Sequence, residues 1–183
     1  MRRLLLAAAI LFAPALASHA QAPALPSADS VLSQAKSTAA AEHKSILLTF
    51  SASWCGPCHL FERFLEDPTI KPIMDKAFVI ASLDVQERPN DQRHADSPGG
   101  EALMTTLGGA NSGVPFITML DPAGKPIVDS LRPDKGGKSN IGYPAVPVEI
   151  DWFMHMLQQG APGLTPADRA TIKQWLDDHM PHR

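Results

Sequence analysis

Two cysteines with two residues between them, Cys55 and Cys58, are the residues of this chain best suited to chemistry. Disulfide exchange needs one accessible thiolate to attack a partner disulfide and a second thiol close by to resolve the mixed disulfide. A structural disulfide usually closes a long loop, because that removes more entropy from the unfolded chain. A bond between residues three apart stabilises little. The pair therefore indicates reversible redox chemistry, in which the disulfide itself is the redox centre and no dissociable cofactor is needed.

A zinc site is the main chemical alternative for a C-x-x-C sequence. The chain holds only two cysteines, so no second pair completes a four-sulfur site. His59 with a remote histidine would make an unconvincing ligand set. We therefore predict no metal.

The elements around the cysteines indicate how the pair is positioned. Residues 46–52 are rich in β-formers and predict a buried strand, and a helix is predicted from Gly56 to Glu66 by its apolar spacing. Cys55 then lies at the first helical turn, where free backbone N–H groups and the helix dipole favour the thiolate. Pro57 suits this turn, since its missing N–H has no intrahelical partner there. Cys58, one turn further in, is expected to be the more shielded.

The remaining pattern predicts an α/β fold, with a central mixed sheet covered by helices on both faces. The other expected elements are helices over 27–42, 101–107 and 148–159, a last helix from Thr165-Pro166, and strands over 78–85, 116–120 and 126–130. A short helix is also expected after Asp67-Pro68. Two insertions are predicted, about 86–100 and 131–147, and the last helix is interpreted as an addition for packing.

The sequence Trp54-Cys55-Gly56-Pro57-Cys58, directly after a buried strand, resembles the active site of thioredoxin. The resemblance runs from about Ser30 to Gln159 and includes Gly113-Val114-Pro115, where thioredoxins carry a cis-proline facing the disulfide. It implies a thioredoxin fold with an extra C-terminal helix, Cys55 as nucleophile, Cys58 as resolving thiol, and supporting roles for Trp54, Gly56, Pro57 and Pro115. It also implies that Val114 exposes backbone groups to a substrate strand.

A finer resemblance concerns Phe61-Glu62 and Asp67-Pro68-Thr69-Ile70. These residues are similar to the C-terminal thioredoxin domain of the electron-transferring membrane reductase family. The resemblance implies an exported reductase whose electron donor is a separate membrane or soluble thiol protein.

Two positions depart from the thioredoxin pattern. Thioredoxin has a buried aspartate five residues before the tryptophan, where this chain has Thr49, and its lysine partner aligns with Ser82. Thr49 cannot take a proton at neutral pH, so resolution must rely on water or on another base such as His59 or Glu62. Protonated His59 would stabilise a thiolate and make the cysteine pair more oxidising. The alternative is an exposed helix residue with a small effect.

Trp54 is interpreted as a lid packed against the disulfide rather than as a core residue. The segment 131–147 is rich in glycine and proline and long for a loop in a compact domain. We hypothesise that residues 140–147, with Tyr143 as an apolar anchor, shape the substrate groove beside the cysteines. A disordered surface insertion is the alternative.

The first residues are typical of a signal peptide, because Arg2 and Arg3 precede an apolar run over 4–16 and small residues follow. Cleavage after Ala20 is expected, although an uncleaved anchor helix is the alternative. The predicted organisation is a signal peptide (1–20), a leader (21–29), a thioredoxin-like domain (30–160) and a helical extension (161–183). Removal of the two arginines changes the formal charge from −3 to −5, which argues against nucleic acid as a partner.

These observations predict a thiol-disulfide oxidoreductase of the periplasm or another exported compartment, active in cell redox homeostasis. Disulfide reduction in exported proteins is the favoured direction, because Gly56-Pro57 is typical of reductants in the family. The function of a disulfide oxidase or isomerase is also possible, because Val114 before the cis-proline and the loss of the buried acid can both change the direction of disulfide exchange. The alternative from another class is a binding module or chaperone for exported thiol or metal-site proteins.

Overall fold

The computed structural model describes residues 25–91 and 94–180. The predicted signal segment therefore lies outside the described residues. The elements, in chain order, are α1 (Ala28–Glu42), β1 (Ser45–Ser51), α2 (Gly56–Glu66), α3 (Lys71–Ala77), β2 (Phe78–Asp84), α4 (Gly100–Thr106), β3 (Phe116–Leu120), β4 (Pro126–Asp129), β5 (Leu131–Asp134), β6 (Gly137–Asn140), α5 (Pro147–Gly160) and α6 (Pro166–Asp178). In the described part of the chain, no helix is both long and apolar enough to cross a bilayer.

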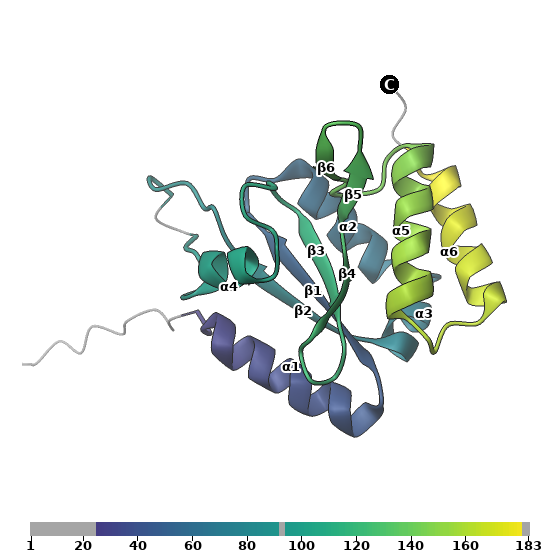
Figure 1. Ribbon diagram of the computed structural model, residues 1–183, viewed down its shortest axis with the longest axis horizontal. Coiled ribbons are helices and arrows are strands. Elements are labelled where there is room, and N and C mark those ends of the chain that lie inside the picture. The colour runs from purple at the N-terminus through teal and green to yellow at the C-terminus, as the bar shows by residue number, and fades with distance from the viewer. Residues whose placement is uncertain (1–24, 92–93, 181–183) are drawn as a thin grey trace, which may run out of the picture.

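Four strands form a central mixed sheet in the order β2-β1-β3-β4 (Figure 1). Strand β1 pairs in parallel with β2, from Ser45 opposite Phe78 to Ser51 opposite Asp84. It pairs with β3 in the antiparallel sense, and β3 pairs likewise with β4. The β1-α2-α3-β2 segment supplies the long crossover that parallel strands need, whereas β3 and β4 need only a short turn. The predicted mixed sheet is confirmed.

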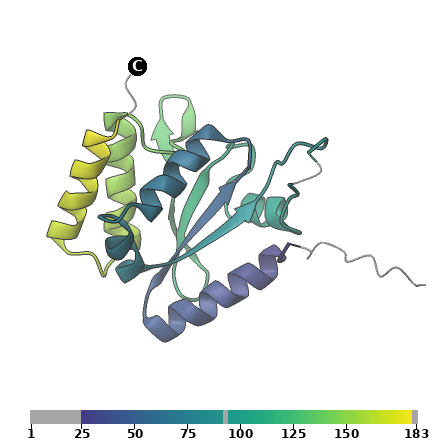
Figure 2. The ribbon, with the colours of Figure 1, turned by 180° about the vertical axis from the view of Figure 1, so that it is seen from behind.

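Strand β1 is buried on both sides and separates two hydrophobic layers. Ile46, Leu48 and Phe50 face the layer formed with α1 and α4. Leu47, between them, faces the layer formed with α2, α3, α5 and α6. Alternate residues of a strand point to opposite faces, so both faces of the sheet are covered by helices (Figures 1 and 2). Thr49, two residues after Leu47, is accordingly directed toward α2.

Aromatic contacts fix helix α2 against the two C-terminal helices. The Phe153 ring of α5 lies 5.9 Å from the Phe61 ring and 5.8 Å from the Phe64 ring, in edge-to-face geometry. The Trp175 ring of α6 lies 5.3 Å from Phe64. Such pairs contribute about 0.5–1.5 kcal/mol each beyond the burial of their surface. The C-terminal helix therefore supports the helix that carries the cysteines.

Helix α6 has the predicted start. The Thr165 hydroxyl accepts from the Asp168 backbone N–H, and the Asp168 carboxylate accepts from the Thr165 backbone N–H, which together form a capping box. Lys76 of α3 also donates to Asp168 at 2.7 Å. This bond, with those from Thr165, lowers the pKa of the Asp168 carboxyl to about 2. The cap thus joins α6 to α3.

Helix α5 approaches the sheet closely at Gly160. A Cβ atom placed at this position would lie 2.5 Å from the sulfur and 2.8 Å from the Cβ of Met119 on β3. No side chain fits at that distance, so glycine is required by the packing of α5 on the sheet. At Gly163, three residues later, an added Cβ atom would lie 3.9 Å from the nearest atom, so this position carries no such constraint.

The prediction of a loop over 131–147 is wrong for its first part. Residues 131–140 form the antiparallel hairpin of β5 and β6, paired from Leu131 opposite Asn140 to Asp134 opposite Gly137. Gly137 has a φ of 133°, a conformation that side-chain-bearing residues rarely adopt, and it allows the tight return. The strands are mostly exposed and polar, so they lack the alternation that marks a half-buried strand. The other elements begin and end within a few residues of their predicted bounds.

Candidate active site

The two cysteines lie where strand β1 turns into helix α2. Cys55 closes the turn, because its backbone N–H donates to the Ala52 carbonyl at 3.0 Å. It is also the N-cap of α2, and its sulfur accepts from the Cys58 backbone N–H at 3.1 Å. Pro57 occupies the first helical turn, as predicted. The two sulfurs are joined in a disulfide.

The exposure of the cysteines differs from the prediction. Each of them is only 2% exposed, so Cys58 is no more shielded than Cys55. Cys55 is covered because it packs together with Ala52, Cys58 and Val114. The residues around it, Trp54, Gly56 and Pro57, are exposed. A partner must therefore contact this rim to reach the sulfur of Cys55.

The peptide bond between Val114 and Pro115 is cis, which confirms that prediction. The Val114 carbonyl oxygen lies 3.5 Å from the Cys55 sulfur. In the reduced protein this oxygen can accept from the Cys55 thiol. The cis peptide thus brings the backbone of Val114 to the sulfur, in the place where the thioredoxin resemblance puts a substrate strand.

Asn140, at the end of β6, holds the loop that contains the cis bond. Its amide nitrogen lies 3.2 Å from the Ser112 carbonyl oxygen, 3.2 Å from that of Gly113 and 3.0 Å from that of Pro115. Its amide oxygen accepts from the Gly142 N–H. Asn140 begins the segment 140–147 that was expected beside the cysteines, but its contacts with the cis-proline loop were not predicted, because its partners lie 25 to 28 positions earlier in the chain.

Tyr143 is buried, as expected of an apolar anchor, but it is not in a position to contact a substrate directly. It is 5% exposed and belongs to the hydrophobic layer with α2 and α5, and this burial raises the pKa of its hydroxyl. It lies in the core and cannot line an open groove. Its buried ring therefore anchors the segment that follows β6.

Trp54 is 44% exposed, so it is not a core residue. Its indole N–H donates to the Gln86 carbonyl at 2.7 Å, and the Arg88 guanidinium carbon lies 5.8 Å from the ring centroid. The start of the 86–100 insertion therefore holds the ring at the rim of the site.

The same insertion forms hydrogen bonds with Ser53, the residue before Trp54. Both the backbone N–H and the hydroxyl of Ser53 donate to the Glu87 carboxylate at 2.6 Å. Glu87 is held in turn, because its N–H donates to Asp96. Ser53 and Glu87 are supporting residues that the sequence pattern did not indicate, since they lie 34 positions apart.

His59 has an acceptor at each ring nitrogen. Its Nδ1 lies 3.1 Å from the Glu62 carboxylate, and its Nε2 lies 3.0 Å from the Ser53 carbonyl oxygen. The bond to Glu62, followed by that to Ser53, raises the pKa of the His59 imidazole. His59 is exposed, in agreement with the alternative that it is an exposed helix residue. Its contact with the Ser53 carbonyl also links it to the segment before the cysteines.

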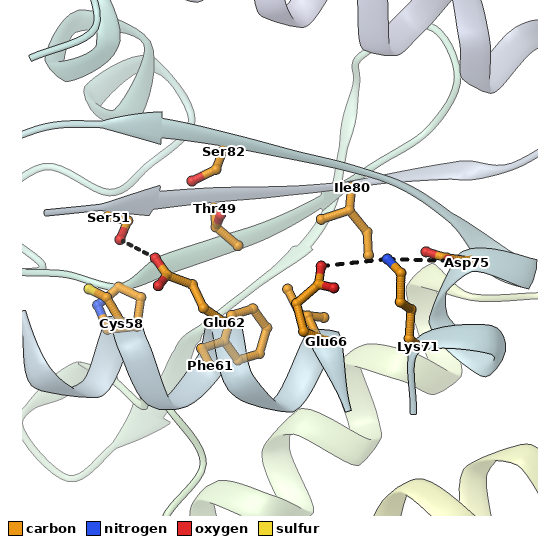
Figure 3. Close-up of a pocket in the computed structure, with 12 residues that line it drawn as sticks. Thr49, Ser51, Cys58, Phe61, Glu62, Glu66, Lys71, Asp75, Ile80 and Ser82 are labelled. Carbon is orange, nitrogen blue, oxygen red and sulfur yellow. Dashed lines mark hydrogen bonds and ion pairs between the residues drawn. The ribbon is translucent and has the colours of Figure 1, made fainter. Parts of the chain in front are cut away.

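A cavity of about 420 Å³ opens beside Cys58, between α2 and the sheet (Figure 3). Thr49 and Ser82 line it and are paired on neighbouring strands. The two positions that the thioredoxin resemblance assigns to a buried acid and a lysine therefore lie side by side, and both carry hydroxyls in this chain. Glu62 reaches into the cavity from α2, and Ser51 donates to its carboxylate at 3.5 Å.

The described residues contain no cluster of three or more histidine, cysteine or acidic side chains that could hold a metal ion.

Comparison with known families decides the assignment. The sequence model described as thioredoxin-like matches residues 28–122, from α1 to the turn after β3. The chain belongs to the thioredoxin-like family. As a thioredoxin-like protein with a C-x-x-C disulfide, it is a thiol-disulfide oxidoreductase whose redox centre is the cysteine pair. A search of curated proteins gives no match.

Solved thioredoxin-like structures resemble the chain at a distance. A disulphide isomerase from Xylella fastidiosa Temecula1 is 22% identical with a TM-score of 0.44, over 54% of this chain and 69% of its own. The oxidised C-terminal domain of DsbD from Neisseria meningitidis is 23% identical with a TM-score of 0.41, over 73% and 99%. A thioredoxin from Thermus thermophilus is 18% identical with a TM-score of 0.42, over 74% and 85%. Likenesses this distant carry no argument about substrates.

Proposed function

We propose that this protein is a protein-disulfide reductase, with Cys55 as the nucleophile and Cys58 as the resolving thiol. The observation that carries the exchange chemistry is the position of Cys55, whereas the reducing direction rests on the resemblance of Gly56-Pro57 to reductants of the family. Its sulfur accepts an N–H bond at the N-terminus of α2 and lies beside the carbonyl of the residue that precedes a cis-proline. The bond and the helix dipole both stabilise a negative sulfur, so Cys55 is suited to act as a thiolate.

The reaction proceeds in two exchanges. The Cys55 thiolate attacks the partner disulfide, forms a mixed disulfide and expels the first partner sulfur as a thiolate, which takes a proton. The Cys58 thiol then loses its proton and attacks the Cys55 sulfur. The Cys55–Cys58 disulfide forms, and the second partner sulfur leaves and is protonated. The partner gains two electrons and two protons, and a separate thiol donor must reduce the disulfide again.

Glu62 is the proposed proton acceptor for Cys58. Its carboxylate lines the cavity beside Cys58 and accepts from Ser51, whereas Glu66, further along α2, is bound by Lys71. Thr49 cannot take a proton there. His59 contacts the same carboxylate from the solvent side. A proton accepted by Glu62 can therefore pass outward to water without crossing the core.

The proposed partners are disulfide-containing exported proteins and a separate thiol electron donor. Export rests on the signal-peptide pattern of residues 1–20 and on the resemblance to the membrane reductase family. The mature N-terminus of the protein, after expression in a bacterium with a periplasm, tests this part. An N-terminus at Gln21 supports export, and intact residues 1–20 in a cytoplasmic fraction contradict it.

The reduction potential of the Cys55–Cys58 pair tests the direction. The protein is equilibrated in glutathione or dithiothreitol buffers, and Trp54 fluorescence reports the fraction oxidised. A value near about −270 mV, as in thioredoxin, supports a reductase. A value near about −120 mV, as in strong oxidants of the periplasm, would make the protein a disulfide-forming enzyme.

A further inference from the structure

The β5–β6 hairpin projects from the end of the molecule at which α2 begins, in both views of the ribbon (Figures 1 and 2). This is the end that carries the disulfide. The two strands of the hairpin pair only with each other, so they form a two-stranded sheet separate from the central sheet. Most of its residues are exposed, so it adds little to the core. Its position beside the active site calls for another explanation.

Asn140 connects the base of the hairpin directly to the reactive surface. Its amide group contacts three carbonyl oxygens of the cis-proline loop, on both sides of Val114. Gly142 packs on the Pro115 ring, since a Cβ at Gly142 would lie 3.5 Å from it. The Ile141 N–H donates to the carbonyl of Ser130, the residue just before β5, and this bond joins the two ends of the hairpin at its base. The hairpin is therefore held in a defined position relative to Val114 and Cys55.

The hairpin carries a positive charge that its own residues do not neutralise. Residues 131–140 contain three basic side chains and one acidic side chain, in a chain with a net charge of −3. The acidic one, Asp134, is already engaged, because Arg132 binds it at 3.2 Å and the Lys135 N–H donates to it at 2.7 Å. Lys135, in the turn, and Lys138, in β6, form no ion pair within the described part of the chain.

The opposite flank of the site has acidic residues, but their carboxylates are engaged. Glu87 accepts two bonds from Ser53, and Glu62 accepts from His59 and Ser51. These groups form the scaffold of the cysteine segment. The lysines of the hairpin are therefore charges at this end of the molecule that are available to a partner, in addition to Arg88, whose guanidinium lies over the Trp54 ring.

We propose that the β5–β6 hairpin is a recognition arm, held against the cis-proline loop by Asn140, that favours polypeptide partners with acidic residues beside the reactive disulfide. The inference rests on the proposed function and names the partner class of the same site. Asn140 acts here as a positioning residue, because it contacts the loop that receives the partner and not the reacting sulfurs. A four-residue strand extends about 13 Å, so the lysines can reach residues near a partner cysteine.

Two disulfide-linked peptides that differ only in their flanking residues test the arm. Glutamates flank the cysteines in one and lysines in the other, and uncharged hydroxyethyl disulfide serves as a third substrate. The full-length reduced protein is mixed with each, and the rate of its oxidation is measured. We expect the acidic peptide to react faster, on the order of tenfold, and the preference to shrink between about 0.05 M and about 0.5 M salt.

Charge reversal at the arm supplies the matched comparison. Lys135→Glu with Lys138→Glu is expected to abolish or reverse the peptide preference while the rate with hydroxyethyl disulfide is unchanged. Lys36→Glu with Lys125→Glu makes the same change in net charge near the β3–β4 turn, at the other end of the sheet, and is expected to keep the preference (Figure 1). Asn140→Ala is expected to weaken the preference, measured as the ratio of the rates with the two peptides.

Three results would overturn the proposal. The first is equal rates with both peptides in the unmodified protein. The second is a preference that survives charge reversal in the hairpin, and the third is a preference lost equally in the Lys36 and Lys125 control. A protein that reduces neither the peptides nor hydroxyethyl disulfide would overturn the proposed function and the arm with it. Melting temperatures of the variants show whether each has folded.

Discussion

Replacement of Glu62 by glutamine separates the two exchanges of the proposed reaction. The change keeps the shape of the side chain and removes its ability to accept a proton. A general base contributes about 10²- to 10⁴-fold to a rate. The cavity beside Cys58, at about 420 Å³, is large enough for several waters at about 30 Å³ each, and these can replace part of the lost base. We therefore expect resolution by Cys58 to slow by about ten- to a hundredfold.

The first exchange, by Cys55, is expected to change much less, so the mixed disulfide should accumulate in Glu62→Gln. Reduced protein is mixed with an oxidised peptide, quenched rapidly in acid and analysed by mass spectrometry for the covalent adduct. Glu66→Gln is the matched control, because Glu66 lines the same cavity one turn further along α2 and points toward Lys71 instead (Figure 3). No accumulation in Glu62→Gln, or equal accumulation in both variants, would refute the role of Glu62.

Two further predictions concern stability. Because folding raises the pKa of His59, its contribution to stability is full below the unfolded pKa of about 6.5 and is lost as pH rises through the folded value. Urea midpoints at acid and alkaline pH should show this loss in the native protein and not in His59→Gln; equal pH dependence in both would contradict it. Gly160→Ala should destabilise the protein by about 1–3 kcal/mol through its clash with Met119, whereas Gly163→Ala should change stability by about 0.5 kcal/mol or less. Similar urea midpoints for these two variants would contradict the packing argument.

The sequence was sufficient to predict the elements whose pattern is local. The apolar spacing of α2, with Pro57 at its start, predicted the bounds of that helix, and two β-rich runs predicted the strands β1 and β2. The cis bond at Pro115 was expected from the family motif alone. These features depend on short stretches of chain, where periodicity and motif leave few alternatives.

The features that were missed depend on contacts between distant residues. The β5–β6 hairpin has short polar strands, so no periodicity marks it. Asn140 and Glu87 act on backbone groups more than twenty positions away, and any polar residue in either insertion could have filled these roles. The burial of Cys55 depends on Val114, which approaches it only when the sheet is assembled. These features depend on tertiary packing, which cannot be read from the local pattern of a single sequence.

The aromatic contacts of α2 imply that the inherited family segment and the cooperative folding unit of this protein are different lengths of chain. The family match ends at residue 122, but Phe64 of the active-site helix packs on Phe153 and Trp175, both beyond that point. A fragment cut at residue 122 would keep the whole C-x-x-C motif and the cis-proline, yet leave one face of the disulfide-bearing helix open to water. The later helices therefore belong to the smallest piece of chain that can be transplanted into another protein with its redox properties intact.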